Sequence, residues 1–161
     1  MSVPVEDLIE RLSNAERRLA DHAAAPPPPG LSDPDPGAEE RWEAGQVWAH
    51  LAEFPAYWLA QARLVTDQVT NAPVPFGRVK TDDGRIAAIE RERHTDPAAL
   101  LERVQASLSE VRRAARGWDA EAWQRRGAHP TRGEMTVERI IEEFIVNHLE
   151  EHADQLDALA R

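Results

Sequence analysis

Cysteine is absent from the 161 residues of this chain. Its absence excludes disulfide bonds, thiolate metal ligands and cysteine nucleophiles, so any bound metal must be held by His, Asp or Glu. The sequence also lacks the run of roughly 18 apolar residues that a membrane-spanning helix needs. Its N-terminus, MSVPVEDLIERL, is acidic and amphipathic and therefore unlike a secretory signal. We therefore expect a cytoplasmic protein that does not bind a membrane.

Basic residues are fewer than acidic ones. The chain has 19 Lys and Arg against 29 Asp and Glu, a formal net charge of −10, so a phosphate backbone would repel it and nucleic acid is not an expected partner. Three familiar signatures are missing as well: the Gly-rich phosphate loop, the G-x-S-x-G elbow and the H-E-x-x-H motif. Because this length suits one domain, we predict that residues 1–161 form a single helical bundle domain.

Apolar residues recur at three- and four-residue spacings in four long segments, which is the pattern of amphipathic helices. Two of these helices have clear start signals: Asp96 is a good N-cap before Pro97, and Thr136 precedes the last segment. Asp119 is placed to cap a single helical turn within residues 118–123. The predicted long helices cover residues of about 5–24, 40–69, 97–116 and 137–160.

The connections between these helices are uneven in length. The proline-rich stretch AAAPPPPGLSDPDPG, about 15 residues, favours an extended connector that crosses the end of the bundle. Pro55 predicts a kink in the second helix. We expect irregular structure with at most one short helical turn in NAPVPFGRVKTDDGRIAAIERERH, and a loop in GAHPTRGEMT. With no strand alternation of any length, the pattern indicates an all-α four-helix bundle with a long crossover connection, not a simple up-down-up-down bundle.

Two of the six histidines lie four residues apart in the motif NHLEEH of the last predicted helix. His148 and His152 therefore project from one helix face, and Ile141 and Phe144 mark that face as the apolar one. A buried imidazole needs partners for both ring nitrogens, and two protonated rings one turn apart would repel each other. A shared metal ion satisfies both conditions. The alternative is a pair of hydrogen-bonded core histidines.

A third ligand has to come from another helix, and His50 is the candidate. It lies on the apolar stripe of the second predicted helix, with Val47, Phe54 and Trp58. An all-imidazole set suits a divalent transition metal, zinc or nickel first and then copper, cobalt or iron, whereas magnesium and calcium prefer oxygen ligands. Three protein ligands leave a position open, which is typical of catalytic sites. An ion there lowers the pKa of bound water to about 7 or holds a thiol as its thiolate.

Other side chains near the proposed ligands have two interpretations each. Glu53 and Glu151 lie three residues after a proposed ligand and could orient an imidazole or exchange protons with a bound water. The other interpretation is favoured, because Glu142, Glu143, Glu150 and Glu151 have the pattern of the solvated face of an acidic helix. Trp48 and Trp58 flank His50 closely enough to form the wall of a pocket, although tryptophans at such positions more often pack in the core.

The remaining histidines fall outside the apolar helix faces. His22 lies at a helix end, and His94 and His129 lie in polar loops, so all three are predicted to be surface residues. The loop that carries His129 leads directly into the last helix and could line the mouth of a pocket.

The stretches GQVWAHLAEFPAYWL and HPTRGEMTVERIIEEFIVNHLEEHADQL resemble the DinB/YfiT-like superfamily of metal-dependent enzymes. The resemblance implies a four-helix bundle with a long crossover. It also implies a metal site made by one histidine of the second helix and an H-x-x-x-H pair of the last. In this sequence those positions are His50, His148 and His152.

The resemblance implies a kind of chemistry as well. Relatives include bacillithiol transferases and mycothiol-dependent maleylpyruvate isomerases, in which a metal activates a low-molecular-weight thiol. We therefore expect a homodimeric, metal-dependent enzyme that transfers mycothiol or bacillithiol to a small electrophile. Because the sequence ends with the last predicted helix, we do not expect the additional C-terminal domain of the isomerases or their specific reaction. The alternatives are hydrolysis by metal-bound water and a non-catalytic bundle that metal or histidine hydrogen bonds stabilise.

Overall fold

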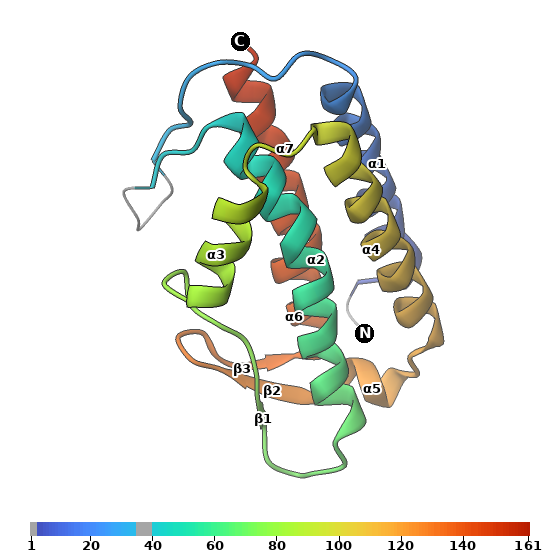
Figure 1. Cartoon of the computed structure of the whole chain (residues 1–161). Coiled ribbons are helices and arrows are strands. Elements are labelled where there is room, and N and C mark those ends of the chain that lie inside the picture. The colour runs from blue at the N-terminus through green and yellow to red at the C-terminus, as the bar shows by residue number, and fades with distance from the viewer. Residues whose placement is uncertain (1–2, 35–39) are drawn as a thin grey trace.

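Four long helical stretches run along the molecule in the computed structural model, which describes residues 3–34 and 40–161 (Figure 1). They are α1, α2, α4 and a last stretch that joins α6, a π-helix (η1) and α7. The predicted four-helix bundle is thus confirmed. The bounds are α1 Val5–Ala23, α2 Ala44–Asp67, α4 Pro97–Gly117, α6 Val137–Ile141, η1 Glu142–Asn147 and α7 His148–Leu159.

The predicted helix starts are confirmed by side-chain caps. Asp96 accepts a hydrogen bond from the backbone N–H of Ala98 at 3.0 Å, and Pro97 occupies the first turn of α4. Thr136 caps α6 in the same way through the N–H of Arg139 at 3.2 Å. The single turn expected after α4 is the short helix α5, capped by Asp119. Its bounds are Ala120–Gln124.

The crossover between α1 and α2 passes over one end of the bundle (Figure 1). Residues 24–34 contain neither helix nor strand, as predicted, and the rest of the predicted connector, residues 35–39, lies outside the described residues. Ser32 and Trp42 close the base of this crossover: the N–H of Ser32 donates to the carbonyl of Trp42 at 2.8 Å, and the N–H of Trp42 donates to Oγ of Ser32 at 2.9 Å. α2 then continues through Pro55 without a break.

The segment between α2 and α4 contains a helix that the sequence did not predict. α3, Asp83–Glu92, has ten residues, so the expectation of at most one helical turn is wrong. The residues TDDG are typical of a turn, but Asp82 is an N-cap whose side chain accepts from the N–H of Arg85 at 2.9 Å. α3 buries Arg85 and Ile89, and it packs along α2.

A small sheet lies at the end of the bundle opposite the crossover (Figure 1). β1 pairs parallel to β2, and β2 pairs antiparallel to β3, so GAHPTRGEMT forms a hairpin and not the predicted loop. Strands of two and four residues are too short to show an alternation of apolar and polar residues. Gly133, which follows the turn between β2 and β3, has a φ of +75°, a value that glycine adopts readily. The bounds are β1 Val74–Pro75, β2 Arg126–His129 and β3 Gly133–Thr136.

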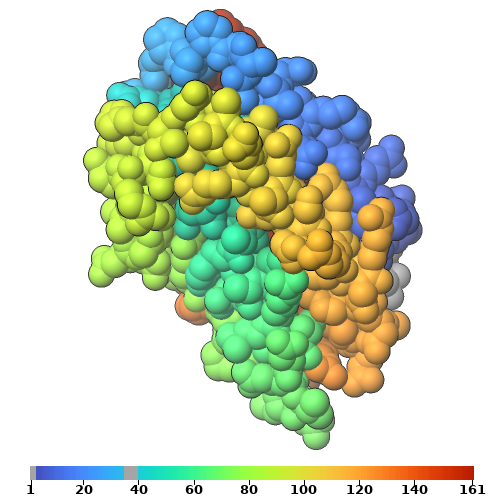
Figure 2. Space-filling view, turned by 45° about the vertical axis from the view of Figure 1, so that its right-hand side comes forward, coloured from blue at the N-terminus to red at the C-terminus, as the bar shows by residue number. Residues whose placement is uncertain are grey.

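The core is centred on α2, which contacts α3, α4, α6, η1 and α7. Figure 2 shows α4 as a band between α1 on one side and α2 with α3 on the other. Trp48, Phe54 and Leu51 of α2 are fully buried. None of the helices in the described ranges combines the length and apolar character needed to cross a bilayer.

Candidate metal centre

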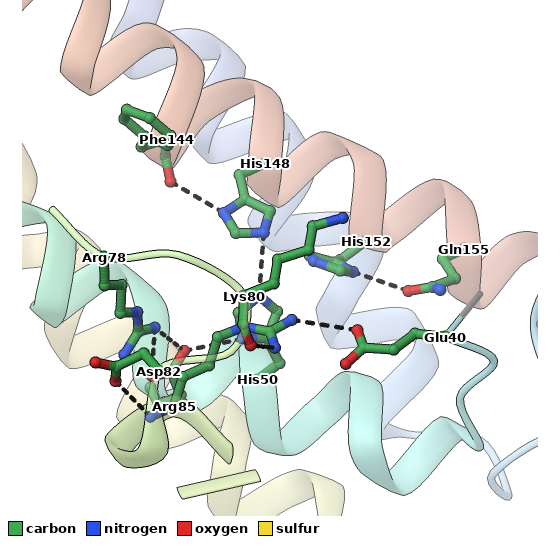
Figure 3. A network of polar contacts seen from close by, with 11 residues as sticks. Glu40, His50, Arg78, Lys80, Asp82, Arg85, Phe144, His148, His152 and Gln155 are labelled. Carbon is green, nitrogen blue, oxygen red and sulfur yellow. Dashed lines mark hydrogen bonds and ion pairs between the residues drawn. The ribbon is translucent and has the colours of Figure 1, made fainter. Parts of the chain in front are cut away.

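Three histidines from two helices meet at one point in the bundle (Figure 3). His50 comes from α2, and His148 and His152 come from successive turns of α7. Their possible ligand atoms all lie within 4.8 Å of one another. His50 is 2% exposed, while the other two are partly open. The structure thus brings together the three histidines that the sequence singled out.

The Nδ1 atom of each ring faces an oxygen acceptor. Nδ1 of His148 lies 3.2 Å from the carbonyl of Phe144, and Nδ1 of His152 lies 2.8 Å from Oε1 of Gln155. Nδ1 of His50 lies 2.9 Å from Oε2 of Glu53, a short contact that is poorly aligned for a hydrogen bond. Acceptors at Nδ1 place the proton there and leave Nε2 as the donor atom for a metal.

The contact between His50 and His148 is either a hydrogen bond, if one ring carries its proton on Nε2, or a place for a cation, if both rings carry it on Nδ1. Their Nε2 atoms lie 3.0 Å apart, and two Nδ1-protonated rings would point lone pairs at each other. Protonation is disfavoured, because burial lowers the pKa of both rings well below 6.5 and the imidazole of His152 lowers both further. The donor set therefore fits a divalent transition metal.

The π-helix η1 precedes the first histidine of α7 directly. A π-helical turn holds one more residue than an α-helical turn, and such turns occur frequently at functional sites. Arg11 of α1 holds η1 in place, since its guanidinium donates to Asn147 Oδ1 at 2.6 Å and also contacts Glu142 and Glu150. Nothing in the letters EEFIVN indicates a π-helix, so sequence reasoning missed it.

Behind His50 lies a buried ion pair between Glu53 and Arg78. The side chains are 10% and 8% exposed, and Nη2 of Arg78 lies 2.6 Å from both carboxylate oxygens. The Arg78 guanidinium also lies 3.9 Å from the centre of the Tyr57 ring. Burial raises the pKa of Glu53, whereas Arg78 opposes that rise. The interpretation of Glu53 as part of a solvated face is therefore wrong, and Arg78 was not foreseen at all.

The three histidines line a cavity of about 1100 Å³. One wall is aromatic: the rings of Trp58 and Phe144 stack with centroids 4.1 Å apart, and Trp42 stacks on His152 at 5.8 Å. Trp58 thus lines the pocket, which was the less favoured of its two interpretations, and it also packs in the core. Trp48 does not line the pocket, because it is buried in the core.

The sequence predictions also concern two further residues that line the cavity, Glu151 and His129. Glu151 is exposed and lines the cavity, and its proposed role in orienting an imidazole stays a prediction. His129 was predicted to be a surface residue, but it is 7% exposed, so that prediction is wrong. His129 lines the same cavity, as the alternative for its loop had suggested.

The hydrogen bonds of His129 explain its burial. Its Nε2–H donates to the carbonyl of Arg78 at 3.1 Å, and its Nδ1 accepts from the N–H groups of Thr131 and Arg132 at 3.2 and 3.1 Å. Gly77 permits the approach: a Cβ atom there would lie 2.5 Å from the His129 ring, and its φ is +91°. His129 therefore fastens the hairpin to the segment before α3.

The other two histidines lie away from the cluster. His94 is exposed, as predicted. His22 lies near the end of α1, half-buried, with Nε2 2.6 Å from Oδ1 of Asp157. Neither belongs to the group of possible metal ligands found in the described part of the chain.

Solved structures with the same fold were found by comparison. YfiT from Bacillus subtilis, described as "a probable metal-dependent hydrolase with an unusual four-helix bundle topology", is 20% identical with a TM-score of 0.73, over 98% of this chain and 86% of that one. The mycothiol-dependent maleylpyruvate isomerase is 15% identical with a TM-score of 0.70, and a histidine-to-alanine mutant of it gives 0.69. This chain spans 61% of the isomerase. At these identities the likeness establishes the fold.

Sequence comparison gives the family. No curated protein matches the chain. A sequence model described as the DinB superfamily, however, matches residues 5–156, which is most of the chain. Together with the bundle topology, this match confirms the resemblance seen in the two ligand-bearing stretches. The chain belongs to the DinB superfamily.

Proposed function

We propose that this chain is a metal-dependent enzyme in which His50, His148 and His152 hold one divalent transition metal, zinc or nickel first. The convergence of the three rings, with each Nδ1 facing an oxygen, supports the proposal. When bound, such an ion supplies a nucleophile by stabilising the anionic form of a thiol or of water. The protein holds the rings in the required tautomer, through the acceptors at Nδ1.

The cavity favours catalysis over a purely structural role. Structural metal sites normally have four protein ligands, whereas in the described residues no carboxylate or fourth histidine joins the group. Glu53 contacts the far side of the His50 ring and is paired with Arg78. The cavity instead reaches the three histidines directly, so a small molecule has access to them. A non-catalytic bundle would not need this access.

Thiol transfer is the reaction that we propose first. The cavity volume of about 1100 Å³ exceeds what one small substrate requires and suits a low-molecular-weight thiol, mycothiol or bacillithiol, together with an electrophile. The isomerase with the same fold is described as mycothiol-dependent. In this chain the stacked rings of Trp58 and Phe144 would bind the apolar part of the electrophile and exclude water from it.

Metal analysis tests the site. Protein purified without an affinity tag should hold, or take up, about one equivalent of transition metal per chain. His148→Ala should lose this uptake, while His94→Ala, which changes an exposed histidine, should keep it. Less than roughly a tenth of an equivalent and no uptake on addition would refute the proposal. Unchanged metal binding in His148→Ala would refute the ligand assignment.

Hydrolysis by metal-bound water is the second candidate, because YfiT is described as a probable metal-dependent hydrolase. The two reactions differ in their need for a thiol. Conjugation of a chlorinated bimane should require mycothiol or bacillithiol, whereas cleavage of a nitrophenyl ester should not. Turnover of the ester alone, without any thiol-dependent conjugation, would favour the hydrolase. The predicted homodimer stays a prediction, which light scattering on the purified protein would test.

A further inference from the structure

Two exposed aliphatic side chains line the cavity that holds the three histidines. Leu31 is 57% exposed, Val79 is 38% exposed, and both belong to the wall of this cavity. The other large apolar side chains that are exposed in the described ranges lie outside it: Leu64, Val69 and Ile86. Apolar surface that stays open inside a cavity is typical of a place where a ligand binds.

The backbone next to Leu31 is fixed, so the exposure of this side chain is not that of a loose loop. Ser32 is 4% exposed and exchanges two hydrogen bonds with Trp42, at 2.8 and 2.9 Å. The ring of Trp42 in turn stacks on His152, with the centroids 5.8 Å apart. The crossover therefore holds Leu31 in a defined position relative to the histidines.

The backbone on both sides of Val79 is fixed as well. The carbonyl of Arg78 accepts from Nε2–H of His129 at 3.1 Å, and the carbonyl of Lys80 accepts from Nη1 of Arg85 at 2.8 Å. Val79 lies between these two anchored carbonyls. Its side chain is thus held at the cavity although it packs only partly against the protein.

The cavity extends to both sides of the histidines. Leu159 follows His152 by seven positions on α7, which is about 10 Å along a helix, whereas Phe144 of the aromatic wall precedes His148 by four. Figure 1 shows the crossover and the C-terminal end of α7 at the same end of the bundle. We call the aliphatic lining residues the aliphatic rim: Pro29, Leu31, Pro34, Val79, Ala158 and Leu159.

The charged residues of the cavity wall have both signs. The carboxylates among the described lining residues are Asp33, Glu40, Glu143, Glu151 and Asp154. The cations in the same part of the wall are Arg78, Lys80, Arg85 and Arg132. A charged end of a ligand gains little net attraction from such a mixed wall. The aliphatic rim, in contrast, binds an uncharged chain by removing apolar surface from water.

We propose that Leu31 and Val79 are specificity-determining residues, which bind an uncharged alkyl chain of the molecule whose reacting end meets the three histidines. This inference rests on the proposed metal site and names the class of its ligand. The chain lies along the aliphatic rim, on the side of the histidines opposite to the stacked rings of Trp58 and Phe144. Chain length, and not charge, therefore decides which ligands bind tightly.

Cobalt-loaded protein provides a direct test, because a thiolate bound to cobalt gives a charge-transfer absorption band that needs no turnover. The wild type should bind 1-pentanethiol about tenfold more tightly than 1-propanethiol, since each buried methylene contributes roughly three- to fourfold. Leu31→Asn combined with Val79→Asn should reduce this ratio to about twofold and leave the dissociation constant of 1-propanethiol unchanged.

Two charged thiols test the chemistry of the chain end. Both 5-mercaptopentanoate and 5-aminopentanethiol should bind more weakly than 1-pentanethiol, because each places a charge against the aliphatic rim. Tighter binding of either one would overturn the proposal, since the wall would then recognise an anion or a cation.

The matched control is Leu64→Asn combined with Val69→Asn, which removes the same two types of side chain at exposed positions outside the cavity. It should retain the wild-type ratio. A chain-length preference that survives the loss of Leu31 and Val79, or that the control also lowers, would overturn the proposal, since the preference would then not depend on these two side chains.

A second readout separates this proposal from the metal site itself. In protein labelled with carbon-13 at the leucine methyl groups, the Leu31 signals are those that Leu31→Asn lacks. If the protein takes up no cobalt, the proposed function fails, and the aliphatic rim is judged on the metal-free protein. A saturable shift of the Leu31 signals that needs less 1-pentanol than 1-propanol supports it. The absence of a shift, or an equal response to both alcohols, overturns it.

Discussion

Nη2 of Arg78 lies 2.6 Å from both carboxylate oxygens of Glu53, in a pair almost closed to solvent. Removing one partner of a buried pair leaves the other charge uncompensated, so Arg78→Met should lower the free energy of unfolding by about 3 kcal/mol. Urea unfolding measures this change. The double variant Arg78→Met with Glu53→Gln should recover part of the loss, whereas strictly additive losses would show that the two side chains act independently.

Glu53 also contacts the ring of His50, and Glu53→Gln therefore bears on metal affinity. Loss of a group that orients a ligand typically weakens metal binding by about 10- to 100-fold. Competition for zinc against a chelator should show a weakening of this order for Glu53→Gln, and none for Glu110→Gln, a half-exposed glutamate of α4 outside the cavity. Equal zinc affinity in both variants would mean that the contact between Glu53 and His50 has no orienting role.

The π-helix η1 sets the angle at which α7 presents its histidines. If the turn stays wide after Glu142 is deleted, His148 and His152 should rotate relative to α6 by about 100°, the angle per residue of a helix, whereas a turn that becomes α-helical would keep their orientation. In the first case we expect a protein that stays helical by circular dichroism and takes up no metal. Full metal uptake after the deletion would show that the extra residue is not what positions the histidines.

The metal-free protein should lose stability as the pH falls. In the folded chain the pKa values of His50 and His148 lie well below 6.5, so the unfolded chain binds more protons in the interval between the folded and unfolded values. Their contribution to stability is therefore complete above pH 6.5 and is lost as the pH decreases below it. Urea midpoints between pH 8 and about 5 should fall for the wild type and change less for a variant with His50→Gln and His148→Gln. A wild-type profile that is flat across this interval would contradict the assignment.

His129 has a structural role that a single substitution can isolate. His129→Ala removes the acceptor of two backbone N–H groups, those of Thr131 and Arg132, and should destabilise the fold by about 2 kcal/mol. Its metal stoichiometry should remain that of the wild type, because His129 is not part of the ligand group. His94→Ala is the matched control and should change neither quantity. Loss of metal from His129→Ala alone would show that the hairpin shapes the site.

Helix periodicity made the histidine cluster predictable. His148 and His152 share a face because they lie four residues apart, and His50 replaces an apolar residue on the stripe of α2. The first fact depends only on local spacing, whereas the choice of His50 as the third ligand depends substantially on the resemblance to the DinB/YfiT-like superfamily. Glu53 was misjudged because its partner, Arg78, is 25 residues away in a segment whose path the sequence does not define.

The elements that the sequence did not predict, α3 and β1, were missed for physical reasons as well. α3 begins with an Asp-Gly pair, which is equally typical of a turn. The helix is favoured only because Ile89 packs against the core. Strand β1 has two residues, Val74 and Pro75, and exists only because β2 lies beside it. Such tertiary pairing cannot be detected from a window of neighbouring residues.

His50 and His148, whose Nε2 atoms meet at 3.0 Å, are separated by 98 positions along the chain. During translation, α2 therefore leaves the ribosome long before α7 is synthesised. A nascent chain that ends before His148 cannot assemble the site. The proposed metal can therefore meet all three ligands only after the last helix has docked. A bundle that folds before it meets the proposed metal has to pack three unmetallated imidazoles together, and the stability of this metal-free state would then set how much protein is able to take up the ion.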